Sequence, residues 1–443
     1  MTVRAIFPSP AGSVKLELVG LPHDPDQMTE PAQSARRTRK YLARQDAIIR
    51  AATVILNEKG LKGITLAEVA DRVGLVSTGI AYYFRSKEDL AAACFQRSIA
   101  AHARFVADAA GCDTVGARIA GLVRSYVERL RQIAVGEADD IAEFDDLRAL
   151  GDETVEAAYV ELFRQVRTIL GRGPATLRGR QTLNSRAHYL LQQIVFVRTW
   201  LRRYDPADFG RAAERMLAIL QDGIATSGNV WSIERVTIPA GSVDREVDPK
   251  EAFLSAATQL ITEQGFRGAS VERIVARLEV TKGAFYYHID AKDDLIEVCY
   301  ARTSEVIRRA QQATEHLPLD AGRRLAGTLA HLVDHQLQGD SPLLRSAFTS
   351  MPAAIRQKVQ TAFDRNNVRF GSMISDGIAD GSLATVDVQI AAHMLSASIN
   401  AAAELGFWLP SGGDGDATET FLRPIFEGLV RQSDGAEGPG FPA

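Results

Sequence analysis

The sequence contains the same segment twice, at an offset of 205 residues. The first copy runs from Ala51 to Leu90 and the second from Ala256 to Leu295, and most positions that differ keep their apolar or polar character. A period of about 200 residues is too long for a solenoid, whose repeats are roughly 20–50 residues long. We therefore interpret the chain as a fused duplication of a complete two-part protein, which restricts its fold to two similar halves.

Each copy predicts the same series of short helices. Residues 46–59 place apolar side chains at helical spacing and end at Gly60, and Thr65-Leu66-Ala67-Glu68 has the pattern of a capping box that begins a short second helix. A turn of about three residues leads to a third short helix over 77–83, and a long fourth helix begins at Ser86. Two short helices joined by a tight turn and braced by another are typical of a helix-turn-helix unit, whose second member enters the DNA major groove.

The sequence of the third helix resembles that of a known protein family. In the second copy the run Thr281–His288 reads Thr-Lys-Gly-Ala-Phe-Tyr-Tyr-His, and Lys292 and Leu295 follow it. These motifs are similar to the DNA-binding domain of the TetR family of bacterial regulators, over about 50 residues in each half. The resemblance implies an all-α fold of two TetR-like units. Each unit would have an N-terminal three-helix helix-turn-helix domain, then a helical domain for ligand binding and dimerisation, and the chain would repress transcription.

Both copies depart from the family pattern. The first has Tyr83 where a His is usual, and the second has Ile289 and Asp290 where Phe and a Pro or Gly are usual. Residues 36–110 carry thirteen Lys or Arg against seven Asp or Glu, whereas residues 245–311 carry ten against eleven. Since phosphate neutralisation dominates affinity for DNA, charge favours the first unit, while the recognition helix is better formed in the second. An open alternative is that one helix-turn-helix binds DNA and the other half is a sensor or dimerisation module.

The residues expected to contact operator DNA lie on and around each third helix, because such a helix reads bases from its N-terminal end while its neighbours hold phosphates. Base or groove contacts are assigned to Ser77, Thr78, Gly79, Thr281, Lys282 and Gly283. Phosphate contacts are assigned to Thr65, Tyr82, Tyr83, Lys87, Ser270, Tyr287, His288 and Lys292. Tyr82 and Tyr287 have an alternative role as partly buried core residues.

The duplication predicts seven segments along the chain. These are a flexible basic lead-in (1–40), a first helix-turn-helix domain with the start of a connecting helix (41–110), a first regulatory domain (111–227), a linker (228–247), a second helix-turn-helix domain (248–312), a second regulatory domain (313–432) and a tail (433–443). The basic cluster Arg36–Lys40 fits an arm lying on phosphates or in the minor groove. A solvated start of the first helix explains it equally well.

The regulatory domains contain aromatic residues that could line an effector pocket among helices. The first domain has the denser set, which favours an apolar or aromatic small molecule: Tyr126, Tyr159, Phe163, Tyr189, Phe196 and Trp200. Ordinary core packing is the alternative role for each of them. His331 and His335 lie one helical turn apart without a third ligand, so we expect neither a metal nor a cofactor.

A chain with two complete helix-turn-helix units has two possible assemblies. Helix-turn-helix proteins place two base-reading helices, here called readers, about 34–36 Å apart on DNA. One chain could supply both readers as an internal pseudo-dimer. Alternatively, two chains could pair as a homodimer with four readers. We favour the internal pseudo-dimer, acting on unlike half-sites. The candidates for four-helix-bundle association are the helices expected over Leu183–Arg203, Arg211–Ala225, Val386–Leu405 and Phe421–Arg431.

Other classes of protein find little support in the sequence. It contains no nucleophile–base signature, phosphate loop or metal-ligand cluster, so we do not expect an enzyme. The cysteines suit a reducing cytoplasm, and Cys94 and Cys299 fall at equivalent positions that predict small core residues. Neither a signal peptide nor a run of 18 apolar residues is present. The sequence therefore predicts a cytoplasmic protein without a membrane span.

Overall fold

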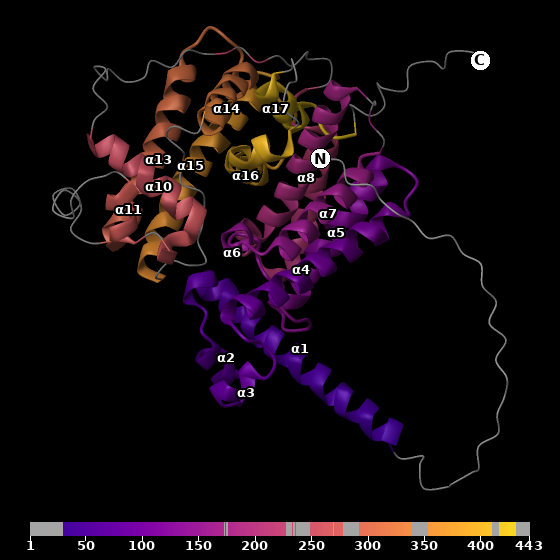
Figure 1. The fold of residues 1–443 in the computed structure, drawn as a ribbon. Coiled ribbons are helices and arrows are strands. Elements are labelled where there is room, and N and C mark those ends of the chain that lie inside the picture. Colours follow the sequence, from indigo (N-terminus) through magenta and orange to yellow (C-terminus); the bar gives the residue numbers. More distant parts are fainter. Residues whose placement is uncertain are drawn as a thin grey trace, which may run out of the picture. The chain divides into compact units, whose positions relative to one another are not determined.

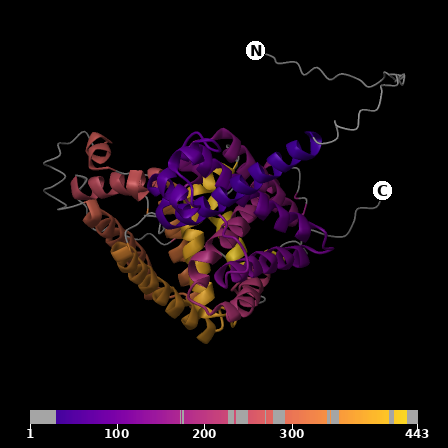
Figure 2. The same cartoon turned by 90° about the horizontal axis from the view of Figure 1, so that it is seen from below.

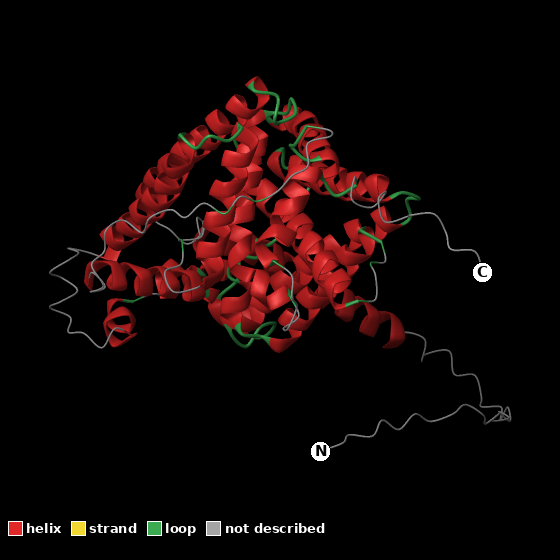
Figure 3. Ribbon diagram, turned by 90° about the horizontal axis from the view of Figure 1, so that it is seen from above, coloured by secondary structure: helices red, strands yellow, loops and turns green. Residues whose placement is uncertain are grey.

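We describe the chain from a computed structural model. The described backbone covers residues 30–171, 173, 176–226, 233, 235, 249–268, 270–277, 292–338, 343, 353–409 and 416–430. The chain divides into two compact units, 1–47 and 48–443, which are described separately. Regular structure in the described residues is helical, and an isolated antiparallel bridge joins Ala225 and Leu383. Figure 3 shows this all-helical character, which confirms the expected all-α class.

The unit 1–47 is described from residue 30 onward. There α1 (Glu30–Gly63) begins, so residues 30–40 of the expected lead-in are helical. The same helix continues into the second unit and loses helical geometry at Gly60, whose φ of 67° is a left-handed value that favours glycine. The predicted stop of the first helix at Gly60 is thereby confirmed.

The second unit contains the remaining helices of the first half and the described helices of the second half (Figure 1). The first half has α2 (Leu66–Arg72), α3 (Ser77–Ala81), α4 (Lys87–Ala110), α5 (Val115–Ala134), α6 (Leu147–Leu150), α7 (Glu153–Ile169), α8 (Leu177–Leu201), a 3-10 turn η1 (Pro206–Asp208) and α9 (Phe209–Asp222). The second half has α10 (Pro249–Gly268), α11 (Val271–Arg277), α13 (Lys292–Glu315), α14 (Ala321–Gln338), α15 (Ala353–Ala379), α16 (Val388–Trp408) and α17 (Ala417–Glu427). The offset of 205 residues also relates described helices of the two halves, since α4 and α13 begin at equivalent lysines.

The duplication is visible in individual contacts. Cys94 on α4 and Cys299 on α13 are 1% and 0% exposed, which confirms that they are core residues. The thiol of Cys94 lies 3.6 Å from the carbonyl oxygen of Ile49. The thiol of Cys299 lies 3.9 Å from the carbonyl oxygen of Leu254, the position equivalent to Ile49. The long fourth helix is therefore attached to the first helix in the same way in both halves.

Side-chain caps determine where the helices of the regulatory domains begin. At the start of α5, the Thr114 hydroxyl accepts a hydrogen bond from the amide of Ala117 at 3.1 Å. At the start of α16, the Asp387 carboxylate accepts from the amide of Ile390 at 3.1 Å. These caps satisfy amides that have no partner inside the helix, and so fix where each helix begins.

The two halves contact each other through α8, α9, α16 and α17, which pack together within one chain. Figures 1 and 2 show α16 (yellow) alongside α8 (magenta). The Gln193 side-chain amide on α8 donates to the Ser398 hydroxyl on α16 at 3.0 Å. These two positions are equivalent in the duplication. A contact between equivalent positions marks a two-fold axis, as in the isologous interface of a homodimer.

Backbone pairing at the ends of α9 and α17 follows the same pseudo-two-fold symmetry. The amide of Ile224 donates to the carbonyl oxygen of Ile425 at 3.0 Å. Its counterpart, the amide of Leu429, donates to the carbonyl oxygen of Leu220 at 2.8 Å. Reciprocal hydrogen bonds between equivalent residues require that the two halves meet through the same surface of each.

Two equivalent glycines permit this close approach. Gly223 and Gly428 have φ values of 73° and 77°. A Cβ atom on Gly223 would lie 2.1 Å from the carbonyl oxygen of Phe426, and one on Gly428 would lie 2.1 Å from that of Gln221. Both the backbone conformation and the space therefore require glycine at these positions.

Two of the expected segments are described little or not at all. Within the linker 228–247 the structure describes Ile233 and Arg235, and the other linker residues lie outside the described part of the chain. The tail 433–443 lies wholly outside it. The proposed segment boundaries therefore remain predictions.

Candidate nucleic-acid interface

The helix-turn-helix of the first half consists of α2, a turn and α3. The Thr65 hydroxyl accepts from the amide of Glu68 at 3.3 Å and caps α2, which confirms the predicted start of this helix. Gly74 adopts a φ of 65° after α2. The amide of Leu75 donates to the carbonyl oxygen of Ala70 at 2.9 Å and closes the turn. The turn thus directs the chain from α2 into α3.

One face of α3 is buried, and its N-terminal residues are presented outward. Ile80 is 0% exposed and holds α3 against the domain core. Ser77 and Thr78 are exposed, and Gly79 is half-buried. A Cβ atom on Gly79 would come no closer than 3.7 Å to the Leu75 side chain, so packing does not require glycine here. The proposed base-reading positions of this half are therefore accessible.

Large apolar side chains flank α3 at the surface. Val76 and Tyr82 are 72% and 74% exposed. The Tyr83 ring is half-buried and lies edge-to-face with the Tyr82 ring, with centroids 5.2 Å apart. The alternative role of Tyr82 as a core residue is therefore wrong. Exposed apolar groups gathered beside a polar helix end are typical of a surface that a partner covers.

The basic side chains near α3 differ in their exposure to solvent. Lys87 is half-buried, and its Nζ donates to the carbonyl oxygen of Leu61 at 3.3 Å. The side chain of Arg85 is 95% exposed and lies 3.7 Å from the Asp89 carboxylate. An ion pair this exposed is weak, so it does not hold the Arg85 guanidinium firmly in place. Arg85 is not among the contact residues predicted from the sequence, although its position just before the Ser86 cap was a usable signal.

The second helix-turn-helix is described in part. Ser270 caps α11, as predicted. Arg277 pairs with Glu263 at 2.9 Å, in the same way that the equivalent Arg72 pairs with Glu58 at 3.7 Å. The bracing of the second helix is thus duplicated. Lys292 is the first residue of α13, and the other proposed contact residues of this half lie outside the described residues: Thr281, Lys282, Gly283, Tyr287 and His288.

A buried charge cluster connects the first helix-turn-helix domain to α8. The Arg198 guanidinium, 11% exposed, lies 2.8 Å from carboxylate oxygens of both Asp140 and Glu143. The Asn57 amide on α1 donates to Asp140 at 3.1 Å, and the backbone amide of Glu143 donates to Asn57 Oδ1 at 2.9 Å. The equivalents of Asn57 and Arg198 in the second half are a threonine and an alanine. The second half therefore lacks the side chains that form this link in the first half.

Three of the six aromatic residues expected in an effector pocket pack at the contact between the halves. The Phe163 ring stacks on Trp408, with centroids 3.7 Å apart, and Tyr159 lies 6.1 Å from the same ring. The Trp200 ring stacks on His393 at 5.8 Å. All three are buried, so these rings fill space between helices.

Of the other three aromatic residues, Phe196 also contacts the second half, with its ring centroid 6.1 Å from that of Phe363. Tyr126 is buried with its ring 5.0 Å from that of His102, and Tyr189 is 0% exposed. Phe196 borders a pocket of about 90 Å³, and Tyr159 borders another of about 330 Å³. Phe196 and Tyr159 therefore border different pockets.

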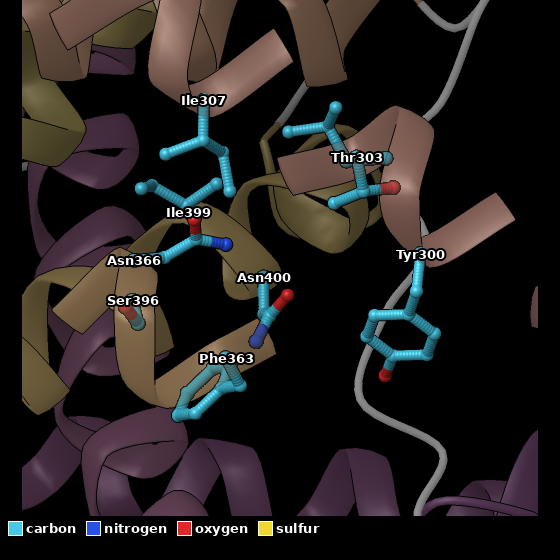
Figure 4. Close-up of a pocket in the computed structure, with 9 residues that line it drawn as sticks. Tyr300, Thr303, Ile307, Phe363, Asn366, Ser396, Ile399 and Asn400 are labelled. Atoms are coloured by element: carbon cyan, nitrogen blue, oxygen red, sulfur yellow. The ribbon is translucent and has the colours of Figure 1, made fainter. Parts of the chain in front are cut away.

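One pocket of the second half is too small for an organic molecule. Figure 4 shows a pocket whose wall includes Tyr300, Phe363 and Asn400. Its volume is about 30 Å³, enough for one or two water molecules. An organic effector does not fit this space as it stands.

The histidine pair of α14, His331 and His335, lies with ring centroids 6.5 Å apart. Within the described ranges, no group of three or more His, Cys, Asp or Glu side chains is arranged to hold a metal ion. The helices of the described part of the chain include none that is both long and apolar enough to cross a membrane.

Both helix-turn-helix segments match a family model. Residues 48–94 and 253–299 match the amino-terminal domain of bacterial regulatory proteins of the tetR family. The chain is 36% identical over 50 residues to the Transposon Tn10 TetC protein of Escherichia coli, covering 11% of this chain and 25% of TetC. It is 25% identical over 138 residues to the HTH-type transcriptional repressor DhaR of Mycobacterium sp. (strain GP1), covering 30% of this chain and 69% of DhaR.

Comparison with solved structures gives a partial superposition. The TetR family transcriptional regulator PfmR from Thermus thermophilus superposes with a TM-score of 0.33 at 20% identity, covering 40% of this chain and 98% of PfmR. The similarity to the TetR family rests instead on the two matched segments, which include α2 and α3 in the first half and α11 in the second. Each half of the chain therefore contains one segment similar to the helix-turn-helix domain of the TetR family.

Proposed function

We propose that this chain is a ligand-responsive transcriptional repressor. It binds double-stranded operator DNA through its helix-turn-helix domains and releases it when a small apolar or aromatic molecule binds. The exposed N-terminal end of α3 and the exposed Tyr82 support the DNA contact. The similarity to DhaR, described as a transcriptional repressor, supports repression. We propose no catalytic role, and we place the protein in the cytoplasm, where a bacterial operator is accessible.

We further propose that a single chain is the DNA-binding unit. The observation that carries this proposal is the reciprocal backbone pairing of Ile224 with Ile425 and of Leu429 with Leu220. A homodimer of single-unit regulators would form its isologous interface between two chains, whereas here the same chain provides both sides. The internal pseudo-dimer then presents two unlike readers to an asymmetric operator.

A second arrangement, in which one helix-turn-helix binds DNA and the other half serves as a sensor or dimerisation module, has a specific observation in its favour. The Asn57–Asp140 link to α8 exists in the first half, and its equivalent residues in the second half cannot form it. The excess of basic residues over 36–110 points the same way. In this arrangement the first unit would supply the DNA affinity.

Single substitutions in the full-length chain separate these arrangements. Thr78→Ala removes a reading hydroxyl in the first unit, and Lys282→Ala removes a reading cation in the second. Gel-shift and footprinting with the upstream region of the chain's own gene measure both. If both units read DNA, each variant weakens protection of a different half-site. If one unit reads DNA, one variant has no effect. If neither variant loses DNA binding, the proposed contact residues are wrong.

The full chain is the appropriate material for this experiment. Separated halves would expose the buried contact surfaces of α8 and α16, including Leu190 and Leu395, which are 0% and 1% exposed in the complete chain. Large exposed apolar surfaces favour aggregation or non-native pairing. Affinities measured on separated halves would therefore mix DNA binding with loss of structure.

A further inference from the structure

Because of the pseudo-two-fold symmetry, the two halves can be compared at equivalent positions. They differ at one place on the contact between them. In the first half, the Trp408 ring at the end of α16 stacks on Phe163 of α7 at an interplanar angle of 17°. The Asn184 amide of α8 donates to the carbonyl oxygen of Trp408 at 2.8 Å. The space between α7, α8 and the end of α16 is thereby filled by aromatic side chains.

The equivalent place in the second half is open. It is bordered by α15, α16 and the end of α8, where Arg203 is the counterpart of Trp408 and Val368 that of Phe163. Asp364 replaces Tyr159 and Gly371 replaces Val166, so shorter side chains stand at each of these positions. The result is a groove of about 570 Å³. Small-molecule sites have volumes of about 300–1,000 Å³.

The groove is lined by buried residues, which include Ala392 and His393, and by exposed ones, which include Val368 and Arg203. Val368 is 69% exposed, although its counterpart Phe163 is 3% exposed. The Arg203 guanidinium donates to Nε2 of His393 at 2.9 Å and pairs with the Asp364 carboxylate. Burial, together with the nearby Arg203, lowers the pKa of His393 to about 3, so this imidazole is uncharged at neutral pH. The ring of Trp200 supports His393 from behind by stacking on it.

The charges of the groove indicate what kind of molecule fits. Arg203 already has Asp364 as its partner, and Asp376 adds a second carboxylate to the wall. A ligand anion would meet two carboxylates against one guanidinium, which disfavours it. A planar guanidinium also stacks well on aromatic rings. An uncharged flat ring is therefore the chemical class that replaces the missing Trp408 and Phe163 rings.

We propose that the groove between α15, α16 and the end of α8 binds an uncharged planar aromatic molecule of two or three fused rings, held between Arg203 and Val368. The site joins residues from both halves, so its occupant would bias how the halves pack and thus the spacing of the two readers. In this regulatory sense the inference rests on the proposed repressor function and names a site and ligand class for its effector. The binding itself does not depend on that function.

Calorimetry with the full chain tests the site, using 2-naphthol as the uncharged probe and 2-naphthoate as its anionic counterpart. We expect 2-naphthol to bind one site per chain, and 2-naphthoate to bind at least ten-fold more weakly. Val368→Phe and Arg203→Trp each insert the side chain that the first half carries at the equivalent place, so the fold has a precedent for both. Each should weaken 2-naphthol binding at least ten-fold. Val135→Phe, a matched change at a 46% exposed position that does not border the groove, should not.

Several results would overturn the inference. These are the absence of saturable 2-naphthol binding, unchanged binding in whichever of the two filling variants retains the wild-type circular dichroism spectrum, and tighter binding of 2-naphthoate. A gel shift with and without 2-naphthol is measured separately. A chain that binds 2-naphthol but no DNA would refute the repressor function and leave the site intact. A chain that binds DNA but not 2-naphthol would refute the proposed site and leave the repressor function intact.

Discussion

The close approach of the two halves at Gly223 predicts a large and specific destabilisation by alanine. Gly223 has φ 73° and ψ −172°, a region open essentially to glycine alone, and placing a Cβ there costs about 1–3 kcal/mol. The new Cβ would also lie 2.1 Å from the carbonyl oxygen of Phe426, so the two backbones must separate. Weakening the adjacent hydrogen bonds from Ile224 and Ala225 costs about 1 kcal/mol each. The expected total is about 3–5 kcal/mol.

Gly428→Ala and Gly136→Ala provide matched comparisons. Gly428 is the symmetry counterpart of Gly223, so its alanine variant should lose a similar free energy of unfolding. Gly136 has a φ of 76° but nothing within 4 Å of its Cβ position, so its variant should lose about 1–2 kcal/mol from backbone conformation alone. Guanidinium titrations followed by tryptophan fluorescence measure all three, because Trp200 and Trp408 lie at the contact between the halves. Equal losses in the three variants would refute the close approach.

Other predictions concern the reading helix and the core. Gly79→Ala should keep or slightly raise stability, since alanine is about 1 kcal/mol better than glycine in a helix, yet weaken operator binding in a gel shift, and unchanged binding would place the groove contact elsewhere. Arg85→Ala should weaken binding to every sequence and reduce the salt-dependence slope by about one, and Lys87→Ala should do the same if it holds a phosphate; a slope equal to that of the wild type would remove the residue from the interface. Burial lowers the pKa of His102 to about 4, below its unfolded value, so the folded state loses stability as the pH falls from about 6.5 towards 4, by about 2 kcal/mol at pH 5. His102→Leu should flatten that part of the pH–stability curve in urea titrations, and an unchanged curve would show that other groups cause the loss.

Local sequence signals predicted the helices well, because their physical causes are local. The Thr65 cap, the stop at Gly60 and the buried thiols Cys94 and Cys299 follow from short-range hydrogen bonding and helical spacing. The exposure of Tyr82 did not follow from spacing, since a tyrosine at that position suits either a core or a phosphate contact. Its environment depends on how α3 sits against the domain core.

Features of the contact between the halves could not be predicted in the same way. That Phe163 and Trp408 stack, and that Val368 and Arg203 border a groove, depends on which helices the duplication brings together. Within one half, Arg203 is simply a basic residue after a long helix. It becomes the counterpart of Trp408 once the pseudo-two-fold symmetry is known. The aromatic residues assigned to a pocket were chosen by density along the sequence, and density does not distinguish a pocket from a packed interface.

The number of chains on one operator tests the central claim most directly. Native mass spectrometry of the full chain with a duplex that contains its footprint measures this number. The internal pseudo-dimer predicts one 48.2 kDa chain per duplex, with the free protein also a single chain. A complex that contains two chains on one footprint, together with a free protein that is wholly dimeric, would contradict the claim that one chain supplies both readers.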